Sequence, residues 1–372
     1  MKAGWEIKTL GEVCEKASSN VSQNQLIDEI GNYPIYGASG FIKNVSFYHR
    51  DKDYISIVKD GAGIGRLTLM KAYSSVIGTL QYLTPKDGLD INFLYYFLSS
   101  VDFLKYKNGS TIPHIYFKDY SVEPVPLPPL PEQKRLVTLL DEAFESIATA
   151  KANAQQNLKN ARALFESHLN EVFAECAKKY GHKTVGEISK NSLGKMLDKA
   201  KNKGEFKPYL RNINVRWFNF DLSDTLEMKF LPEETEKYTA VKGDVLICEG
   251  GYPGRAAIWQ NDEPIYFQKA LHRVRFHEIE HNKWFVYFLF SQDSGGSLRQ
   301  YFTGAGIQHF TGSALKQFKI PIPPIEETKL YIAKFDTLAE ETQRLEALYS
   351  RKIAALDELK KALLHLAFSG EL

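Results

Sequence analysis

The sequence predicts an α+β protein made of two tandem α/β domains, each followed by a long helix. The two helices are expected to pair as an antiparallel coiled coil with pseudo-two-fold symmetry. Three observations predict this fold: short motifs occur twice in the same order, a proline-rich segment follows each mixed region, and heptad patterns follow the prolines. Of the 372 residues, 44% are hydrophobic and 25% charged, a balance typical of globular domains.

The internal repeat is visible in several short motifs. KTLGEV at Lys8–Val13 returns as KTVGEI at Lys183–Ile188, and PLPPL at Pro126–Leu130 returns as PIPPI at Pro321–Ile325. The separation between copies is larger at the prolines than at the first motif, so the second copy carries insertions. After the prolines the separation stays constant, as expected of helices that tolerate no insertion.

Each copy begins with a mixed region in which short β-type runs, such as Tyr54–Val58 and Asp244–Cys248, are separated by Gly, Asn and Asp turns. The prolines of Glu123–Pro131 and Lys319–Pro324 are expected to stop any strand or helix from passing through. The resulting boundaries are a first domain over residues 1–130, a helix over 131–180, a second domain over 181–325 and a helix over 326–372.

Both predicted helices carry apolar residues at alternating four and three residue steps, which is the heptad seam of a coiled coil. Pairing the two helices with each other in antiparallel fashion buries both stripes, while a parallel or intermolecular coil remains the alternative. The first seam is Leu140, Phe144, Ile147, Ala154, Leu158, Ala161, Phe165 and Val172, with Lys151 and His168 as misfits. The second is Leu338, Thr342, Leu345, Tyr349, Leu356, Leu359, Leu363 and Leu366, with Lys352 as the misfit.

Composition excludes several protein classes. The 47 Lys and Arg residues nearly balance 45 Asp and Glu residues, which excludes a polycation. Cys14, Cys176 and Cys248 are too far apart for a CxxC zinc site, and an odd number of cysteines does not suit a secreted disulfide scaffold. We find no signal peptide and no apolar run long enough to span a membrane, so a cytoplasmic protein is expected.

Three motifs suggest catalysis, but their contexts do not support it. HEIEH at His277–His281 matches the zinc-protease pattern, yet it aligns with a turn of the first copy. Gly61–Gly65 follows a strand, but no helix follows to bind a pyrophosphate. The Glu-x-Lys pairs at Glu132 and Glu327 lie at helix starts, where glutamate suits the helix dipole. We therefore expect no catalytic or metal site; a nuclease or metal-dependent hydrolase built on these motifs is the alternative.

A basic run precedes Trp217 in the second mixed region. It is either a solvated face or a nucleic-acid contact. Its members are Lys195, Lys199, Lys201, Lys203, Lys207, Arg211 and Arg216.

The repeated plan resembles the specificity (S) subunit of type I restriction–modification systems, the HsdS family. The resemblance covers essentially the whole chain and rests on the tandem order together with WEIKTLGE at Trp5–Glu12, PLPPLPEQ at Pro126–Gln133, the glycine loops at Gly109 and Gly304, and AFSGEL at Ala367–Leu372. One departure is the second hinge, where IEET replaces LPEQ.

The resemblance implies a non-catalytic DNA reader in a system that defends against foreign DNA. Two target recognition domains would each read one half of an interrupted double-stranded site, and the paired helices would hold them apart. Two modification subunits would bind S-adenosylmethionine and methylate adenine. Restriction subunits would translocate and cleave DNA with ATP and magnesium, so no cofactor is expected on this chain. A coiled-coil scaffold with β-rich ends and no DNA role is the alternative from another class.

Two pairs of equivalent loops are the candidate DNA contacts: Lys59–Arg66 with Glu249–Arg255, and Asn108–His114 with Thr303–His309. Glycine permits close approach of the backbone, and polar side chains can bond base edges or phosphates. The alternative is that each loop histidine is satisfied within its own turn. The predicted DNA-binding residues are Lys59, Arg66, Ser110, Thr111, His114, Lys203, Arg211, Arg216, Tyr252, Arg255, Gln308 and His309.

Overall fold

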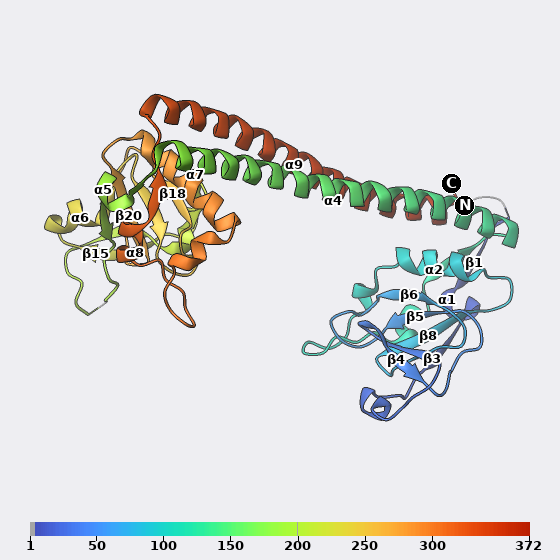
Figure 1. Ribbon diagram of the computed structural model, residues 1–372. Coiled ribbons are helices and arrows are strands. Elements are labelled where there is room, and N and C mark those ends of the chain that lie inside the picture. Colours follow the sequence, from blue (N-terminus) through green and yellow to red (C-terminus); the bar gives the residue numbers. More distant parts are fainter. Residues whose placement is uncertain (1–3, 199) are drawn as a thin grey trace. The chain divides into compact units, whose positions relative to one another are not determined.

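The computed structural model describes residues 4–198 and 200–372, so Lys199 lies outside the described residues. Contacts within the chain divide it into two units. The first contains the residues up to Gln155 together with Ser350–Leu372, and the second contains Gln156–Tyr349. Each unit therefore holds one mixed region, the start of the helix that follows it and the end of the other helix (Figure 1).

In the first unit a four-stranded antiparallel sheet separates two layers of core. Alternate residues of its central strand point to opposite faces, as the period of two requires. Ile55 and Ile57 pack toward helix α2 (Ile91–Ser100), whereas Tyr54 and Val58 pack toward a second, three-stranded sheet. The strand orders are β2 (Cys14–Ser18), β8 (Leu80–Pro85), β5 (Tyr54–Val58), β6 (Leu67–Met70), and β4 (Gly40–Val45), β3 (Tyr33–Gly37), β7 (Ser75–Val76).

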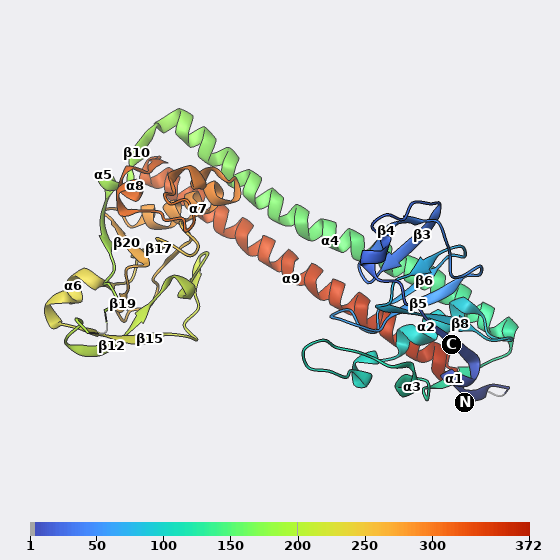
Figure 2. The same ribbon diagram turned by 90° about the horizontal axis from the view of Figure 1, so that it is seen from below.

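The second unit repeats this topology, which confirms the tandem fold. In both units the second sheet contains an antiparallel pair, β3 with β4 and β12 with β15, and one parallel pair, β3 with β7 and β12 with β19. Figure 2 shows β12, β15 and β19 as neighbours. The orders are β11 (Ser189–Leu193), β20 (Leu271–Phe276), β17 (Val245–Cys248), β18 (Ala256–Ile258), and β15 (Leu226–Phe230), β12 (Glu205–Leu210), β19 (Ile265–Phe267), β16 (Thr239–Ala240).

Smaller elements complete the units. Helix α7 (Glu280–Ser294) is the counterpart of α2, and the hairpin of β13 (Val215–Arg216) and β14 (Asn219–Phe220) lies between β12 and β15 in the sequence. The short helices are α3 (Phe117–Tyr120), α6 (Thr235–Tyr238) and α8 (Gly312–Gln317). In the described part of the chain, no helix combines the length and apolarity needed to cross a membrane.

The repeated KT(L/V)GE motif forms the same helix start in both units. After β1 (Glu6–Thr9) and β10 (His182–Thr184) come the one-turn helices α1 (Leu10–Val13) and α5 (Val185–Ile188). The backbone N–H of Thr9 donates to Glu12 Oε2 at 2.6 Å, and that of Thr184 donates to Glu187 Oε2 at 2.6 Å. These are capping boxes, which satisfy N–H groups left free at a helix start.

Each proline hinge contains a short strand that the sequence did not predict, although no strand or helix passes through the whole hinge. β9 (Pro124–Leu127) pairs antiparallel with β1, and β21 (Lys319–Pro321) pairs with β10. Proline is tolerated because each strand lies in a two-stranded ribbon, where one edge needs no N–H donor. The buried Gln133 donates to Pro128 O at 2.9 Å, and Thr328 donates to Pro324 O at 3.1 Å. The second hinge thus keeps a side-chain hydrogen bond to a proline carbonyl, although IEET replaces LPEQ there.

Helices α4 (Leu130–Tyr180) and α9 (Ile325–Ser369) run antiparallel within each unit, which confirms that expectation. In the first unit Arg135 donates to Leu372 O at 2.9 Å, and Lys151 pairs with Asp357 at 2.6 Å. In the second unit Arg162 pairs with Glu346 at 2.5 Å, and the Tyr180 hydroxyl donates to Glu327. In each unit, the residue number along α4 rises while the number of its partner in α9 or just after it falls, as antiparallel packing requires.

After Tyr349 the predicted seam of α9 fails at Leu359, although Leu356, Leu363 and Leu366 are half-buried as predicted. Leu359, a predicted seam residue, is 47% exposed, whereas Ile353 is half-buried and Ala367 is fully buried. From Tyr349 the contact positions therefore advance by four residues to Ile353, instead of by three residues to the predicted misfit Lys352. A helix with 3.6 residues per turn drifts from a strict seven-residue repeat, and such a step restores its contact face.

Candidate nucleic-acid interface

In the first unit the structure brings the two predicted loops together. The turn between β5 and β6 lies against the loop before α3 through backbone hydrogen bonds. The Gly61 N–H donates to Pro113 O at 2.9 Å, and the Ile115 N–H donates to Lys59 O at 2.9 Å. His114 also bridges to Asn108 across its own loop. The two loops thus form one surface, whose predicted residues Ser110 and Thr111 are exposed.

The second unit repeats this arrangement. His309 bridges to Gly250 of the β17–β18 turn and to Thr303 of its own loop, and the Phe310 N–H donates to Glu249 O at 2.7 Å. Gln308 is exposed at this loop.

A glycine shapes each of the two histidine loops. Gly109 and Gly304 have φ values of 80° and 106°, in the region that favours glycine. An added Cβ would lie 2.5 Å from Ile112 O and 2.2 Å from Ile307 O, respectively. Only glycine therefore allows these loops to close.

The two loop histidines have different partners. His114 Nδ1 lies 2.7 Å from Asp60 Oδ1, so this nitrogen is satisfied within the loop pair. His309 Nδ1 lies 4.0 Å from Glu249 Oε2 and has no hydrogen-bond partner among the described residues. The alternative that each loop histidine is satisfied within its own turn therefore applies to Nδ1 of His114 and not to Nδ1 of His309.

Arg66 and Arg255 occupy equivalent places at the ends of the two turns. Arg66 Nη1 donates to Ala38 O at 2.9 Å, and Arg255 Nη2 donates to Asn212 O at 3.0 Å. The Arg255 guanidinium also lies over the Tyr252 ring, 4.8 Å from its centroid. Each arginine therefore links the turn to the segment that follows a strand of the second sheet, β3 in the first unit and β12 in the second.

Asn212 is a positioning residue that sequence reasoning missed. Its side-chain amide donates to Gly250 O at 3.1 Å, while its carbonyl accepts from Arg255. Tyr252 is held as well, because its hydroxyl donates to Asp293 Oδ2 at 3.2 Å. Contacts made through backbone carbonyls leave no residue pattern, so no signal in a single sequence could have found Asn212.

The basic run does not form one surface. Lys195 is only 7% exposed, and its ammonium donates to Glu234 at 2.5 Å and to Lys229 O at 2.9 Å. This lysine is structural. Arg211 and Arg216 pair with nearby aspartates, Asp224 at 2.8 Å and Asp221 at 3.2 Å. Lys203 is exposed in the segment before β12, and Lys59 pairs with Asp60 at 3.1 Å.

The motifs that suggested catalysis are structural. His277 is exposed in the turn after β20, whereas His281 is buried in α7. Glu132 pairs with Arg135 at 2.7 Å, and Glu327 accepts from Tyr180. No group of three or more His, Cys, Asp or Glu suited to a metal occurs in residues 4–198 and 200–372.

The three cysteines are buried, as expected of inert core residues. Burial raises the pKa of the Cys248 thiol to about 11 and that of Cys14 to about 12.

Comparison with known proteins identifies the family. The model of the type I restriction modification DNA specificity domain matches residues 2–160 and again residues 178–353. The chain is 23% identical to the MjaVIII specificity subunit of Methanocaldococcus jannaschii, covering 99% of this chain and 93% of that protein. It is 22% identical to the EcoDI specificity subunit of Escherichia coli, covering 99% and 88%.

Two solved structures share the fold. One, from work on assembly and conformational transition of a type I restriction–modification system, has a TM-score of 0.79 at 17% identity and covers 100% of this chain and 99% of its own. The HsdS subunit from Thermoanaerobacter tengcongensis has a TM-score of 0.59 at 18% identity, covering 100% and 98%. With the family domain matched twice over most of its length, the chain belongs to the specificity subunits of type I restriction–modification systems, the non-catalytic components that carry the DNA specificity domains.

Proposed function

We propose that this chain reads an interrupted DNA site in two halves, one through residues 1–130 and the other through residues 181–325. The observation that carries the proposal is the duplicated loop pair, in which a histidine loop closes on a turn that ends in arginine. A reader with two equivalent surfaces suits a site with two separate halves, just as the symmetry of a dimeric DNA-binding protein mirrors that of its site.

Within each half, we assign the direct DNA contacts to the exposed polar residues of the loop pair. Arginine and glutamine can bond base edges, while lysine and the hydroxyl side chains suit phosphates. The twelve predicted residues remain the candidates, of which Lys203, Arg211 and Arg216 belong to the basic run and lie outside the loop pair. Those of the first unit are Lys59, Arg66, Ser110, Thr111 and His114, and those of the second are Lys203, Arg211, Arg216, Tyr252, Arg255, Gln308 and His309.

The partners follow from the family. Two modification subunits would bind S-adenosylmethionine and methylate adenine within the site that this chain selects. Restriction subunits would use ATP and magnesium for translocation and cleavage. This chain would work in the cytoplasm and hold none of these cofactors. Its net charge of only +2 is compatible with this role, because partner subunits can supply part of the phosphate neutralisation.

The test is co-expression of the chain with its cognate modification subunits, followed by methylation-sensitive sequencing of the host genome. We expect one interrupted motif with a modified adenine. A contiguous motif would contradict two-part reading. If no adenine is modified and the assembled complex shows no salt-dependent DNA binding, the coiled-coil scaffold becomes the better interpretation.

A further inference from the structure

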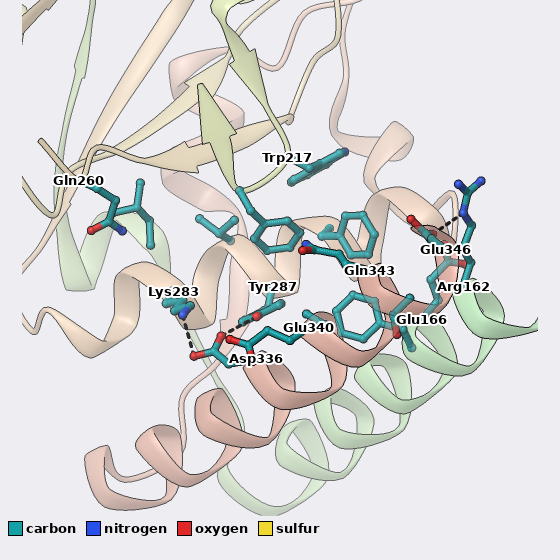
Figure 3. A pocket seen from close by; sticks show the side chains of 17 residues that line it. Arg162, Glu166, Trp217, Gln260, Lys283, Tyr287, Asp336, Glu340, Gln343 and Glu346 are labelled. Carbon is teal, nitrogen blue, oxygen red and sulfur yellow. Dashed lines mark hydrogen bonds and ion pairs between the residues drawn. The ribbon is translucent and has the colours of Figure 1, made fainter. Parts of the chain in front are cut away.

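The second unit contains a cleft of about 520 Å³ that the proposed DNA interface does not use. It lies between α7, the β13–β14 hairpin and the paired helices α4 and α9 (Figure 3). Five aromatic side chains form much of its wall: Phe165, Trp217, Phe218, Tyr287 and Phe290. Phe218 contacts Tyr287 and Phe290 with ring centroids 5.0 and 5.3 Å apart.

The backbone of Phe218 is strained. Its φ is 64°, a conformation that is rare for a bulky side chain, and the side chain is still 37% exposed. Strain of this kind is kept where the surrounding structure holds it and often marks a binding site. Here β18 holds the turn of the hairpin, because the Phe218 N–H donates to Ala256 O at 3.2 Å. The hairpin thus presents an aromatic ring to the cleft at a cost in local energy.

The charged residues of the cleft are mostly acidic, with four carboxylates against two basic side chains. In Figure 3 Trp217 lies across the cleft from Asp336, Glu340 and Gln343 of α9. The two basic residues of the lining, Lys283 and Arg162, are engaged by Asp336 at 2.7 Å and by Glu346 at 2.5 Å.

Two further carboxylates of the lining, those of Glu166 and Glu340, have no ion-pair partner among the described residues. The cleft is therefore negative and aromatic, which repels phosphate and favours a cation.

The first unit shows what such a surface binds. Tyr96 donates to Asp141 there, just as Tyr287 donates to Asp336 in the second unit. Beside Tyr96, the Lys360 ammonium lies 4.8 Å from the centroid of the Phe144 ring. By the constant spacing after the prolines, the counterpart of Lys360 is Phe165, an apolar residue of the cleft. The first unit thus supplies its own cation over an aromatic ring, whereas among the described residues no cation lies over the rings of Trp217, Phe218, Tyr287 or Phe290 in the second.

We propose that this cleft binds a lysine or arginine side chain of the modification subunit. The inference rests on the proposed function, because that function names the protein partners. The negative charge of the cleft excludes the DNA backbone as the occupant. A cationic side chain would place its charge near Glu166 and Glu340 and its apolar stem against Phe218 and Phe290.

The test is calorimetric titration of the intact chain with its cognate modification subunit at low ionic strength. For the double variant E166Q/E340Q we expect binding about five- to tenfold weaker, because two charge contacts are lost. The difference should shrink at high salt, where exposed charges are screened. The matched control is E142Q/E145Q, which removes two exposed carboxylates from α4 in the first unit and includes the counterpart of Glu340.

A second variant separates binding from folding. F218G removes the aromatic ring and suits the positive φ, so we expect weaker binding with unchanged or higher thermal stability. Equal affinities for wild type, E166Q/E340Q and F218G would overturn the inference while the proposed function stands. Equal loss in the control, or loss confined to binding of the restriction subunit, would also overturn it. A wild-type chain that binds no modification subunit would instead overturn the proposed function.

Discussion

His114 Nδ1 lies 2.7 Å from Asp60 Oδ1, although the two residues are 54 positions apart in the chain. This contact joins the histidine loop to the β5–β6 turn. A carboxylate bound to one imidazole nitrogen fixes the ring and its tautomer and leaves the other nitrogen for a ligand. The counterpart contact in the second unit, His309 with Glu249, is longer at 4.0 Å. The two readers thus share a plan but differ in detail.

Replacing either loop histidine should weaken DNA binding. We expect H114A and H309A each to lose on the order of 1–3 kcal/mol if the ring contacts a base. D60N should lose less, because it only loosens the ring. Fluorescence anisotropy of the assembled complex on its own site measures the effect, with H277A as the control at an exposed histidine outside the loops. Unchanged affinity in both loop variants would contradict the placement.

Each turn arginine should affect only its own half of the site. R66A is expected to relax base preference in the half read by residues 1–130, and R255A in the half read by residues 181–325. The reason is that each arginine is held within its own unit, by Ala38 O or by Asn212 O. Competition with DNA altered in one half at a time measures this. Loss of preference in both halves from one substitution would argue against independent readers.

Two lysines of the basic run should behave oppositely. K195A removes the buried partner of Glu234 and is expected to cost about 3 kcal/mol of unfolding free energy. K203A should leave stability within about 0.5 kcal/mol, because this lysine is exposed. If Lys203 contacts a phosphate, the variant should reduce the salt slope of DNA binding by about 1. Urea denaturation and salt titration separate the two effects.

The shifted seam of α9 can be tested with a matched pair of substitutions. I353A should destabilise the protein by about 1–2 kcal/mol, since it shortens a half-buried side chain on the contact face. L359A should change stability by less than about 0.5 kcal/mol, since Leu359 is largely exposed. Chemical denaturation of both variants measures the two losses of unfolding free energy. A larger loss for L359A than for I353A would restore the strict heptad predicted from sequence.

Acid should weaken the helix start of each repeat. Hydrogen bonds from the Thr9 N–H and hydroxyl lower the pKa of Glu12 from 4.5, and those from the Thr184 hydroxyl and N–H lower that of Glu187. A lowered pKa in the folded state means that the stabilisation is present above the unfolded value and lost as pH falls below it. The variant E12Q/E187Q should therefore show a smaller fall in Tm between about pH 5 and pH 3 than the wild type. An equal fall would show that the capping boxes do not contribute.

Much of the fold could be predicted because the sequence states it twice. The strand Tyr54–Val58 has the predicted bounds, and the loops around His114 and His309 lie where their glycines suggested. The strands formed by the proline hinges were missed, because a two-stranded ribbon tolerates residues that a central strand does not. The change of contact position to Ile353 was missed, because a strict heptad pattern cannot distinguish the rotational drift of a helix from a single exception such as Lys352.

The site was harder to predict than the fold. Charge alone placed Lys195 with exposed lysines, but whether a lysine is buried depends on Glu234, which lies 39 positions away. Likewise Arg255 is held by the backbone of Asn212, 43 positions earlier in the chain. Such long-range contacts depend on how the second sheet folds over the first, and local patterns carry no information about them.

The exchange of helix ends between repeats also sets the order of events during synthesis. Leu364 and Ala367 belong to the core of the first unit, and Phe368 packs on Phe93 with ring centroids 5.3 Å apart. At about 5–20 residues per second, a ribosome needs tens of seconds to get from the first mixed region to these residues. Until then the nascent first unit exposes the apolar patch that α9 will cover. A chain that lacked Leu364, Ala367 and Phe368 would thus have a first unit with an open core, which chaperones and proteases can recognise.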